Sequence, residues 1–244
     1  ENCATAPQYL ISMHFYPDQI FHIYNQGNNR RRIFFTDENY RFFLWKMRAY
    51  LLPFGDFISW CLMPNHFHWQ FYAKQIEIEV RLFREHVDET EYRRRLHKYG
   101  KRAQPVDRSW SRKRRQNEIV SLNEAIGMLE HSYSQAINKE RNMSGSLFRK
   151  PCKAKDGFIE ELVTLRKPNG QLDHRFMSGI NYDYVCFCYI HDNPEEAGLV
   201  KKNTDWPYSS ARDYAGLRKG TLCNVELGRR LLGLEKNEIP SLLG

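Results

Sequence analysis

The stretch LMPNHFHWQFY, residues 62–72, places two histidines one residue apart inside a run of bulky apolar residues typical of a β-strand. Side chains at alternate positions of a strand share one face. The pattern therefore predicts a buried aromatic face and an opposite polar face that carries His66, His68, Gln70 and Tyr72. Two imidazoles on one face lie close enough to bind one metal ion together. An isolated pair of this kind is more often two ordinary half-exposed residues.

Strand and helix signals surround this stretch. Phe57–Leu62 is a second strand-like run, joined to the strand at residues 66–73 by Met63–Asn65, which suits a tight hairpin turn. Earlier in the chain, Phe21–Asn25 alternates as a strand should and runs into a turn rich in Gly and Asn. Between these strands, Thr36 caps a predicted helix that ends at Pro53. The helix has one apolar face, formed by Tyr40, Phe43, Leu44, Met47 and Leu51.

The second half of the chain predicts another helix and strand. Ser121-Leu-Asn-Glu124 is a capping box, and it is followed by apolar residues at helical spacing. Leu147–Ala154 is a candidate fourth strand, placed at a sheet edge because it contains a proline. The order β-α-β-β-α-β is that of a ferredoxin-like split βαβ unit. We therefore expect an α+β fold with an antiparallel sheet and helices on one face.

A third helix is predicted from about Tyr182 to His191. It should stop near Asn193-Pro194, because proline disfavours helical geometry in the residue before it. Asn193 would then cap a short segment, Pro194 to Ala197, that Gly198 closes.

A length of 244 residues suits one sizeable core with insertions. We expect a single domain, large enough to hold an active site, at residues 1–205. It would carry insertions at about 78–117 and 157–176, and a C-terminal extension at 206–244 would pack on it. Six cysteines without a CxxC pair predict reduced thiols rather than a disulfide framework. No apolar stretch reaches the roughly 18 residues of a membrane helix, so a cytoplasmic protein is expected.

The net charge of +8 favours a polyanion as partner. The segment Arg81–Arg115 holds thirteen basic and five acidic side chains, so it alone nets +8. Such clustering favours a nucleic-acid contact, with Tyr99 and Trp110 available for base stacking. The alternative is a solvated, partly disordered basic loop.

Several motifs together resemble a known family. Pro64-Asn65-His66-Phe67-His68 looks like the HUH motif (His, bulky hydrophobic, His) of single-tyrosine transposases, specifically the REP-associated tyrosine transposases of bacteria. Similar segments occur in the same order along roughly Phe21 to Gly216. They are Tyr24-Asn25-Gln26-Gly27-Asn28-Asn29, Tyr189-Ile190-His191-Asp192-Asn193-Pro194 with Ala197-Gly198-Leu199-Val200, and Trp206-Pro207-Tyr208-Ser209-Ser210.

The resemblance implies a ferredoxin-like domain that nicks and rejoins single-stranded DNA near a hairpin. It implies that Tyr189 attacks a DNA phosphate to form a 5′-phosphotyrosine, while His66 and His68 hold a divalent ion and a 3′ hydroxyl leaves. Asn193 lies one helical turn after Tyr189 and would supply a third ligand through its amide oxygen. Two histidines and an amide suit Mg²⁺ or Mn²⁺ on an oxygen-rich substrate; zinc would have only Cys61 as a nearby thiol.

Other roles for these residues stay open. Tyr189 also fits an apolar helical stripe. Tyr133 is a second candidate nucleophile, because related enzymes place the tyrosine on a helix with a glutamine four residues later, although Gln135 is only two residues away. Core packing is the more expected role for Tyr133. His191 lies two residues from Tyr189 and should point elsewhere on a helix.

The resemblance also suggests where DNA would bind. The turn after the first strand, the edge strand and the basic insertion are polar and basic, although the turn could be only a turn. The candidate contacts are Asn28, Asn29, Arg30, Arg31, Arg32, Arg149, Lys150, Lys153, Arg112, Lys113, Arg114 and Arg115. Trp206–Ser210 is expected to pack the tail onto the domain. The two insertions depart from the family pattern, and they either recognise a particular hairpin or decorate a domesticated copy.

Two other classes compete with a metal-dependent endonuclease and strand transferase. A hairpin-binding regulator would keep the fold without catalysis. An RNA-binding ferredoxin-like domain would expose stacking aromatics on the face where the histidines are placed. The expected partner is hairpin-forming single-stranded DNA, bound by a monomer or a homodimer that associates with the bacterial nucleoid.

Overall fold

The computed structural model describes residues 14–102, 118–150, 152–156 and 182–234. Its main sheet has four strands, each antiparallel to its neighbours, in the order β2-β3-β1-β6. The strands are β1 (Gln19–Gln26), β2 (Gly55–Met63), β3 (His66–Ala73) and β6 (Lys153–Asp156). The predicted α+β class and the split βαβ order are confirmed, with β6 at the expected edge.

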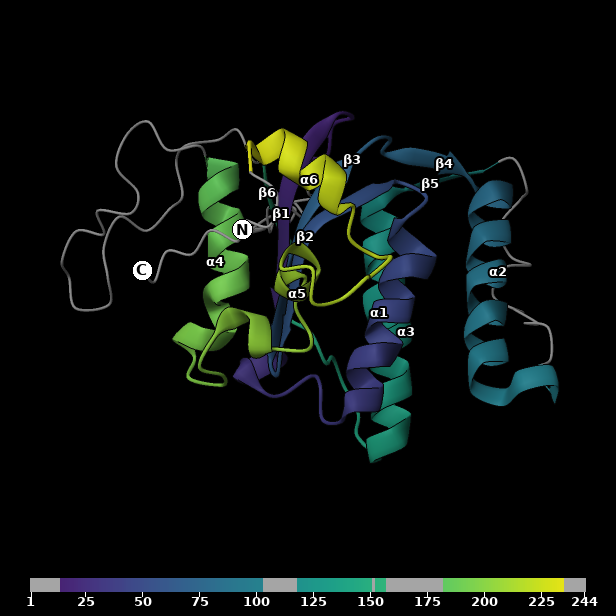
Figure 1. The fold of residues 1–244 in the computed structure, drawn as a ribbon. Helices are drawn as coiled ribbons and strands as arrows, with labels where there is room; N and C mark the ends of the chain where they lie inside the picture. Colours follow the sequence, from purple (N-terminus) through teal and green to yellow (C-terminus); the bar gives the residue numbers. More distant parts are fainter. Residues whose placement is uncertain (1–13, 103–117, 151, 157–181, 235–244) are drawn as a thin grey trace, which may run out of the picture.

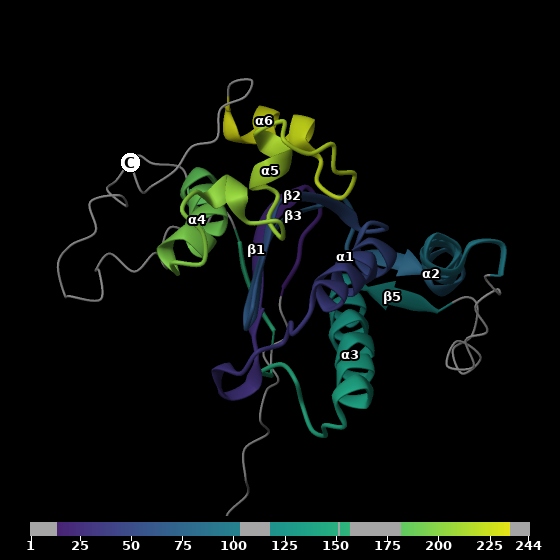
Figure 2. The same cartoon turned by 60° about the horizontal axis from the view of Figure 1, so that its bottom comes forward.

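Helices cover both faces of this sheet. In Figure 1 and Figure 2, α1 (Asp37–Leu51) and α3 (Leu122–Arg141) lie side by side on one face, and α4 (Tyr182–Glu196) lies on the other. The aromatic side of β3 points toward α1 and α3, where Phe67, Trp69 and Phe71 are fully buried. The prediction of helices on one face holds for α1 and α3, whereas α4 is added against the polar face.

The helix starts follow local sequence chemistry. The Thr36 side chain accepts from the backbone N–H of Asn39, and the Asn39 side chain reaches back to the cap, which completes a capping box. Ser121 and Glu124 form the predicted box at the start of α3. The α1 helix ends at Leu51, two residues before Pro53, as expected.

Two predicted boundaries are wrong. The α4 helix continues through Pro194 to Glu196 instead of stopping before the proline, and Asn193 lies inside it rather than capping a new segment. Pro194 falls in the last turn, where the missing N–H costs a single helical hydrogen bond. The regular fourth strand begins at Lys153 rather than Leu147, although Phe148 forms an isolated antiparallel bridge with Gly27 just after β1.

The first insertion contains a helix instead of a solvated loop. β4 (Glu77–Glu79) pairs with β5 (Ile119–Ser121), and between them run α2 (Val80–Tyr99) and η2 (Gly100–Arg102). The helix packs beside α1 through a buried apolar stripe and a Lys46–Glu91 ion pair of 2.5 Å. Residues 103–117 and the second insertion, at about 157–176, lie outside the described residues.

The C-terminal part packs against β2, as predicted for Trp206–Ser210. The N–H of Leu62 donates to the carbonyl oxygen of Tyr208 at 2.9 Å. Short helices η6 (Asn203–Asp205), α5 (Ala211–Tyr214) and α6 (Val225–Leu232) complete this layer. The five cysteines in the described ranges are buried thiols that form no disulfide there. Among the helices described, none has the length and apolarity needed to cross a membrane.

Candidate active site on the polar face of the sheet

Two histidines from β3 and two residues from α4 meet on the polar face. The rings of His68 and Tyr189 lie 5.2 Å apart, edge to face, and those of His66 and His68 lie 5.0 Å apart. The Nε2 atom of His66 is 3.3 Å from Oδ1 of Asn193. Residues more than a hundred positions apart in sequence therefore form one cluster.

Packing and hydrogen bonds fix α4 over the histidines. Cys186 and Ile190 of α4 form a small apolar cluster with Cys61 and Met63 of β2. At the start of the helix, Nε2 of Gln70 donates to the carbonyl oxygen of Asp183 at 2.7 Å. These contacts determine which helical positions face β3.

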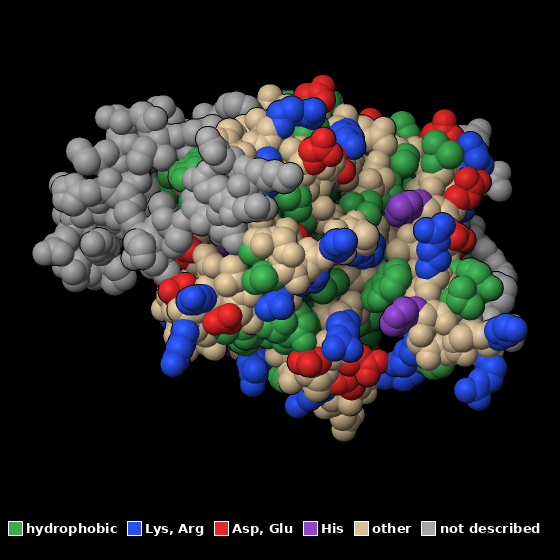
Figure 3. Space-filling model, viewed as in Figure 1, with side chains coloured by type: hydrophobic (Ala, Val, Ile, Leu, Met, Phe, Trp, Pro, Cys, Tyr) green, Lys and Arg blue, Asp and Glu red, His purple; other side chains and the backbone are tan. Residues whose placement is uncertain are grey.

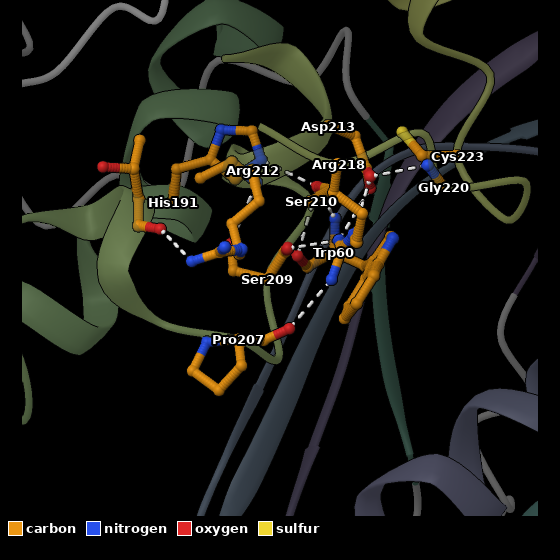
Figure 4. Close-up of polar contacts among 12 residues, drawn as sticks. Trp60, His191, Pro207, Ser209, Ser210, Arg212, Asp213, Arg218, Gly220 and Cys223 are labelled. Atoms are coloured by element: carbon orange, nitrogen blue, oxygen red, sulfur yellow. Dashed lines mark hydrogen bonds and ion pairs between the residues drawn. The ribbon is translucent and has the colours of Figure 1, made fainter. Parts of the chain in front are cut away.

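A second contact that fixes α4 comes from the C-terminal segment around Ser210. Nε2 of His191, fully buried, lies 2.7 Å from Oγ of Ser210, and that hydroxyl also bonds the backbone of Trp60 on β2 (Figure 4). The His191 ring thus points away from the histidine pair of β3, as expected. Its role is to tie α4 to β2 through Ser210.

The amide side chains determine which nitrogen of His66 carries a proton. Nδ2 of Asn65 donates to the carbonyl oxygen of Arg30 at 3.2 Å, so Oδ1 of Asn65 faces Nδ1 of His66 at 2.7 Å. An amide oxygen only accepts, so Nδ1 of His66 must donate to it. In the neutral ring the lone pair then lies on Nε2.

That lone pair faces another acceptor. Nδ2 of Asn193 donates to the carbonyl oxygen of Tyr189 at 3.0 Å, which leaves Oδ1 of Asn193 directed at Nε2 of His66. Burial lowers the pKa of His66, which favours the neutral ring, although the Asn193 side chain opposes this shift. Two facing lone pairs create an electron-rich site that suits a cation.

The donor set available there is two imidazoles and one amide. Burial, reinforced by His22 and His66, lowers the pKa of His68 well below its usual value, so His68 is neutral at pH 7. Across the described residues, no group of three or more His, Cys, Asp or Glu side chains converges as a metal cluster. Any ion here would therefore keep open positions for substrate oxygens.

Tyr189 is half-buried and lines a pocket of about 250 Å³. Burial raises the pKa of its phenol, and a hydrogen bond with the Asn193 side chain opposes that rise. The remaining lining residues are Tyr24, Asn25, Gln26, His66, His68, Arg149 and Lys153. The pocket therefore combines two phenols, two neutral imidazoles and two cations.

The other predicted DNA contacts are only partly gathered here. Arg149, Lys150 and Lys153 are exposed on and before β6, and the first and third line the pocket. The turn after β1 folds as η1 (Asn28–Arg30), next to Gln26 at the pocket rim, and none of its residues lines the pocket. Arg31 donates to the carbonyl oxygen of Ser146, and Arg32 is exposed. Arg112, Lys113, Arg114 and Arg115, like Trp110, lie outside the described residues.

The described part of the basic insertion carries less free charge than its sequence suggests. On α2, Arg81 pairs with Glu85 and Arg93 with Glu89. Figure 3 shows basic and acidic side chains interspersed on the face that α1 and α2 share, rather than one basic patch. Tyr99, predicted to stack on bases, is 52% exposed at the end of α2.

Tyr133 is excluded from the pocket by its position. It is fully buried on the α3 side of the sheet, and its hydroxyl donates to the carbonyl oxygen of Ile33 at 2.8 Å. Core packing, the role expected for it, is confirmed.

Sequence reasoning missed several neighbours of the site. His22, Tyr24 and Gln26 occupy alternate positions of β1 and face the polar side of β3, because the register pairs them with Gln70, His68 and His66, respectively. The polar alternation of β1 carried this signal. Tyr182 of α4 was also missed, and its hydroxyl lies 3.4 Å from Nδ1 of His22.

Glu130 of α3, on the other side of β1, is a further residue that sequence reasoning missed. Its carboxylate accepts from Nδ2 of Asn25 at 2.8 Å. Burial raises its pKa from 4.5 to about 7, despite opposing hydrogen bonds from Asn25 and Cys152. The folded state therefore holds a proton that the unfolded state has lost between pH 4.5 and 7. Stability should fall as the pH rises through this window and then level off.

We expect Glu130→Gln to remove that pH dependence and to raise the free energy of unfolding at pH 8 by about 1–3 kcal/mol. The amide keeps an acceptor for Asn25 without the buried charge. Urea unfolding at pH 5 and pH 8 measures the effect. Glu77→Gln, which changes an exposed carboxylate on β4, is the matched control. Equal shifts for both variants would contradict the argument.

Comparison with solved structures finds one similar protein chain. No family model and no curated protein matches the present chain. The structure of a REP-associated tyrosine transposase bound to a REP hairpin is similar with a TM-score of 0.42 and 14% identity, over 87% of this chain and 92% of that one.

Proposed function

We propose that the protein is a metal-dependent single-stranded DNA endonuclease and strand transferase that acts at hairpins through a tyrosine nucleophile. The observation that carries this proposal is the convergence of Tyr189 and Asn193 on His66 and His68 within one pocket. The motif resemblance supplies the reaction type. Two flanking cations, Arg149 and Lys153, suit a nucleic-acid backbone.

In this proposal His66, His68 and Asn193 hold Mg²⁺ or Mn²⁺. Two donors bound side by side to one such ion, at about 2.1 Å each, lie about 3 Å apart. The 3.3 Å between Nε2 of His66 and Oδ1 of Asn193 fits that spacing. The ion would supply Lewis-acid stabilisation of the scissile phosphate.

The chain's own residues would perform the displacement. The Tyr189 oxygen forms a bond to phosphorus as the bond to the 3′ oxygen breaks, which leaves a 5′-phosphotyrosine and a 3′ hydroxyl. The phenol proton passes to water in the open pocket, and the departing 3′ oxygen takes up one proton. Attack by a 3′ hydroxyl on the phosphotyrosine reverses these steps and rejoins DNA.

The test uses hairpin oligonucleotides labelled at one end and incubated with the protein and Mn²⁺. We expect a covalent species on a denaturing gel that retains a 3′-end label, while a 5′-labelled fragment is released. Stable binding without cleavage would support a non-catalytic hairpin-binding regulator instead. A covalent species that retains the 5′-end label would contradict the 5′ linkage.

The pH dependence of cleavage follows from the pKa shifts of Tyr189 and of the two histidines. Burial raises the pKa of Tyr189, so the phenolate fraction grows about tenfold per pH unit below it. Both histidines have lowered pKa values and stay neutral above pH 7. We expect the single-turnover rate at saturating Mg²⁺ to rise by about tenfold per unit from pH 7 to 8.5. A rate that falls over this range would contradict a phenolate nucleophile.

Arg149 and Lys153 should contribute to DNA affinity through charge. Each neutralised phosphate of single-stranded DNA adds about 0.7 to the slope of log affinity against log salt. We therefore expect Arg149→Gln and Lys153→Gln each to lower that slope by about this amount in fluorescence titrations. Arg93→Gln on α2, whose guanidinium is paired with Glu89, is the control and should leave the slope unchanged.

A further inference from the structure

His22 is joined to a proposed metal ligand on the neighbouring strand. The register pairs Tyr24 with His68, so His22 stands diagonally from His68 on the same face. Nε2 of His22 lies 2.9 Å from Nδ1 of His68, and the rings stack at 5.1 Å. Both residues are buried, with 7% of His22 and 6% of His68 exposed. This buried contact leaves only Nε2 of His68 for an ion.

The hydrogen bonds of this pair form a short chain with Tyr182. Its hydroxyl lies 3.4 Å from Nδ1 of His22, so each neutral ring must donate at one nitrogen and accept at the other. In one arrangement the protons point from Tyr182 toward His68, and His68 then carries its proton on Nε2. In the reverse arrangement, Nδ1 of His68 donates to Nε2 of His22, and Nδ1 of His22 donates to Tyr182.

Only the reverse arrangement leaves a lone pair on Nε2 of His68. A metal ligand needs that lone pair, and partners of the other ring nitrogen commonly fix it. The two proposed ligands differ in this respect. Asn65 offers His66 only an acceptor, so the tautomer of His66 is set by the amide. His68 faces a second imidazole, which accepts or donates according to its own proton.

We propose that His22 is a positioning residue for metal binding: by accepting from Nδ1 of His68, it keeps Nε2 of His68 free to bind the divalent ion. This inference rests on the proposed function. Tyr182 completes the chain as acceptor for His22. In this role His22 and Tyr182 act through His68 rather than on the DNA. Their effect is therefore on the affinity of the site for the divalent ion.

The experiment measures Mn²⁺ affinity by electron paramagnetic resonance, with and without a hairpin oligonucleotide. His22→Phe removes the acceptor, and we expect it to weaken Mn²⁺ binding by about 10- to 100-fold. His22→Gln places an amide oxygen near the position of Nε2 and should restore affinity to within about threefold of wild type. Thermal melting verifies that each variant folds. An unchanged Mn²⁺ affinity in folded His22→Phe would overturn the inference.

Two further measurements separate the inference from the proposed function. His66→Ala and His68→Ala enter the same titration, and if neither weakens Mn²⁺ binding, the proposed metal site itself fails. If both weaken it and His22→Phe does not, only the role of His22 fails. Nitrogen-15 spectra of the wild-type histidines with Mg²⁺ need no variant: we expect the His68 proton on Nδ1. A proton on Nε2 of His68 in the metal-bound state would overturn the inference.

Discussion

Tyr189→Phe is expected to abolish the covalent protein–DNA adduct and to slow single-turnover cleavage by at least about 10³-fold. The substitution removes the one oxygen that would bond to phosphorus. It keeps the ring that packs against His68 and the apolar cluster of α4. Stability should therefore change little, and a melting curve checks this. The adduct is measured on a denaturing gel with 3′-end-labelled hairpin DNA and Mn²⁺.

Tyr24 supplies the matched control for this experiment. Its ring stacks on His68 at 5.7 Å, and it is the second tyrosine that lines the pocket with Tyr189. Burial raises its pKa, and Tyr189 and Cys152 add to the rise. Tyr24→Phe should keep the adduct. An adduct that survives in Tyr189→Phe and disappears in Tyr24→Phe would assign the nucleophile to Tyr24.

Local rules were sufficient for the sheet and its two central helices. Polar and apolar residues alternate along β3 (His66–Ala73), and the turn before it contains proline and asparagine. The helices α1 and α3 each begin at a capping residue. These signals act within a few residues of the chain, and the tertiary packing agrees with the secondary structure that they predict. The chain order of such elements then limits the topology to a small number of sheets.

The α2 helix was missed although its pattern is local. Val80, Phe83 and Val87 recur at helical spacing, but charged residues surround them and hide the stripe from a composition-based interpretation. The next position of that stripe is Glu91, a buried carboxylate that pairs with Lys46 of α1 and with Arg94. A buried ion pair between distant segments cannot be predicted from one of them.

The site could be predicted only in outline. The motifs named the two histidines, Tyr189 and Asn193, and the structure brings their side chains together. The register of β1 against β3 is what adds His22 and Tyr24 to the same face, and no single strand contains that information. The one-turn spacing of Tyr189 and Asn193 was visible in the sequence, whereas the end of α4 was misplaced, because the helix continues through Pro194 to Glu196.

Arg218 and Asp213 form a clamp that holds the C-terminal segment on β2. Arg218 donates through Nε and Nη2 to both carboxylate oxygens of Asp213, each at 2.7 Å, and the Asp213 side chain is 3% exposed (Figure 4). Arg218 also donates to the carbonyl oxygens of Pro207 and Ser209. Its guanidinium lies over the ring of Trp60. One side chain thus neutralises a buried carboxylate and fastens the segment before α5.

We expect Arg218→Ala to lower the free energy of unfolding by about 3–5 kcal/mol, because it leaves the Asp213 carboxylate buried without its partner. Urea unfolding measures this loss. Asp213→Ala with Arg218→Ala removes both charges, so the double variant should be less destabilised than the sum of the single variants. Strict additivity would contradict the clamp. Because Ser210 lies in the fastened segment and bonds His191 of α4, adduct formation by folded Arg218→Ala should fall as well.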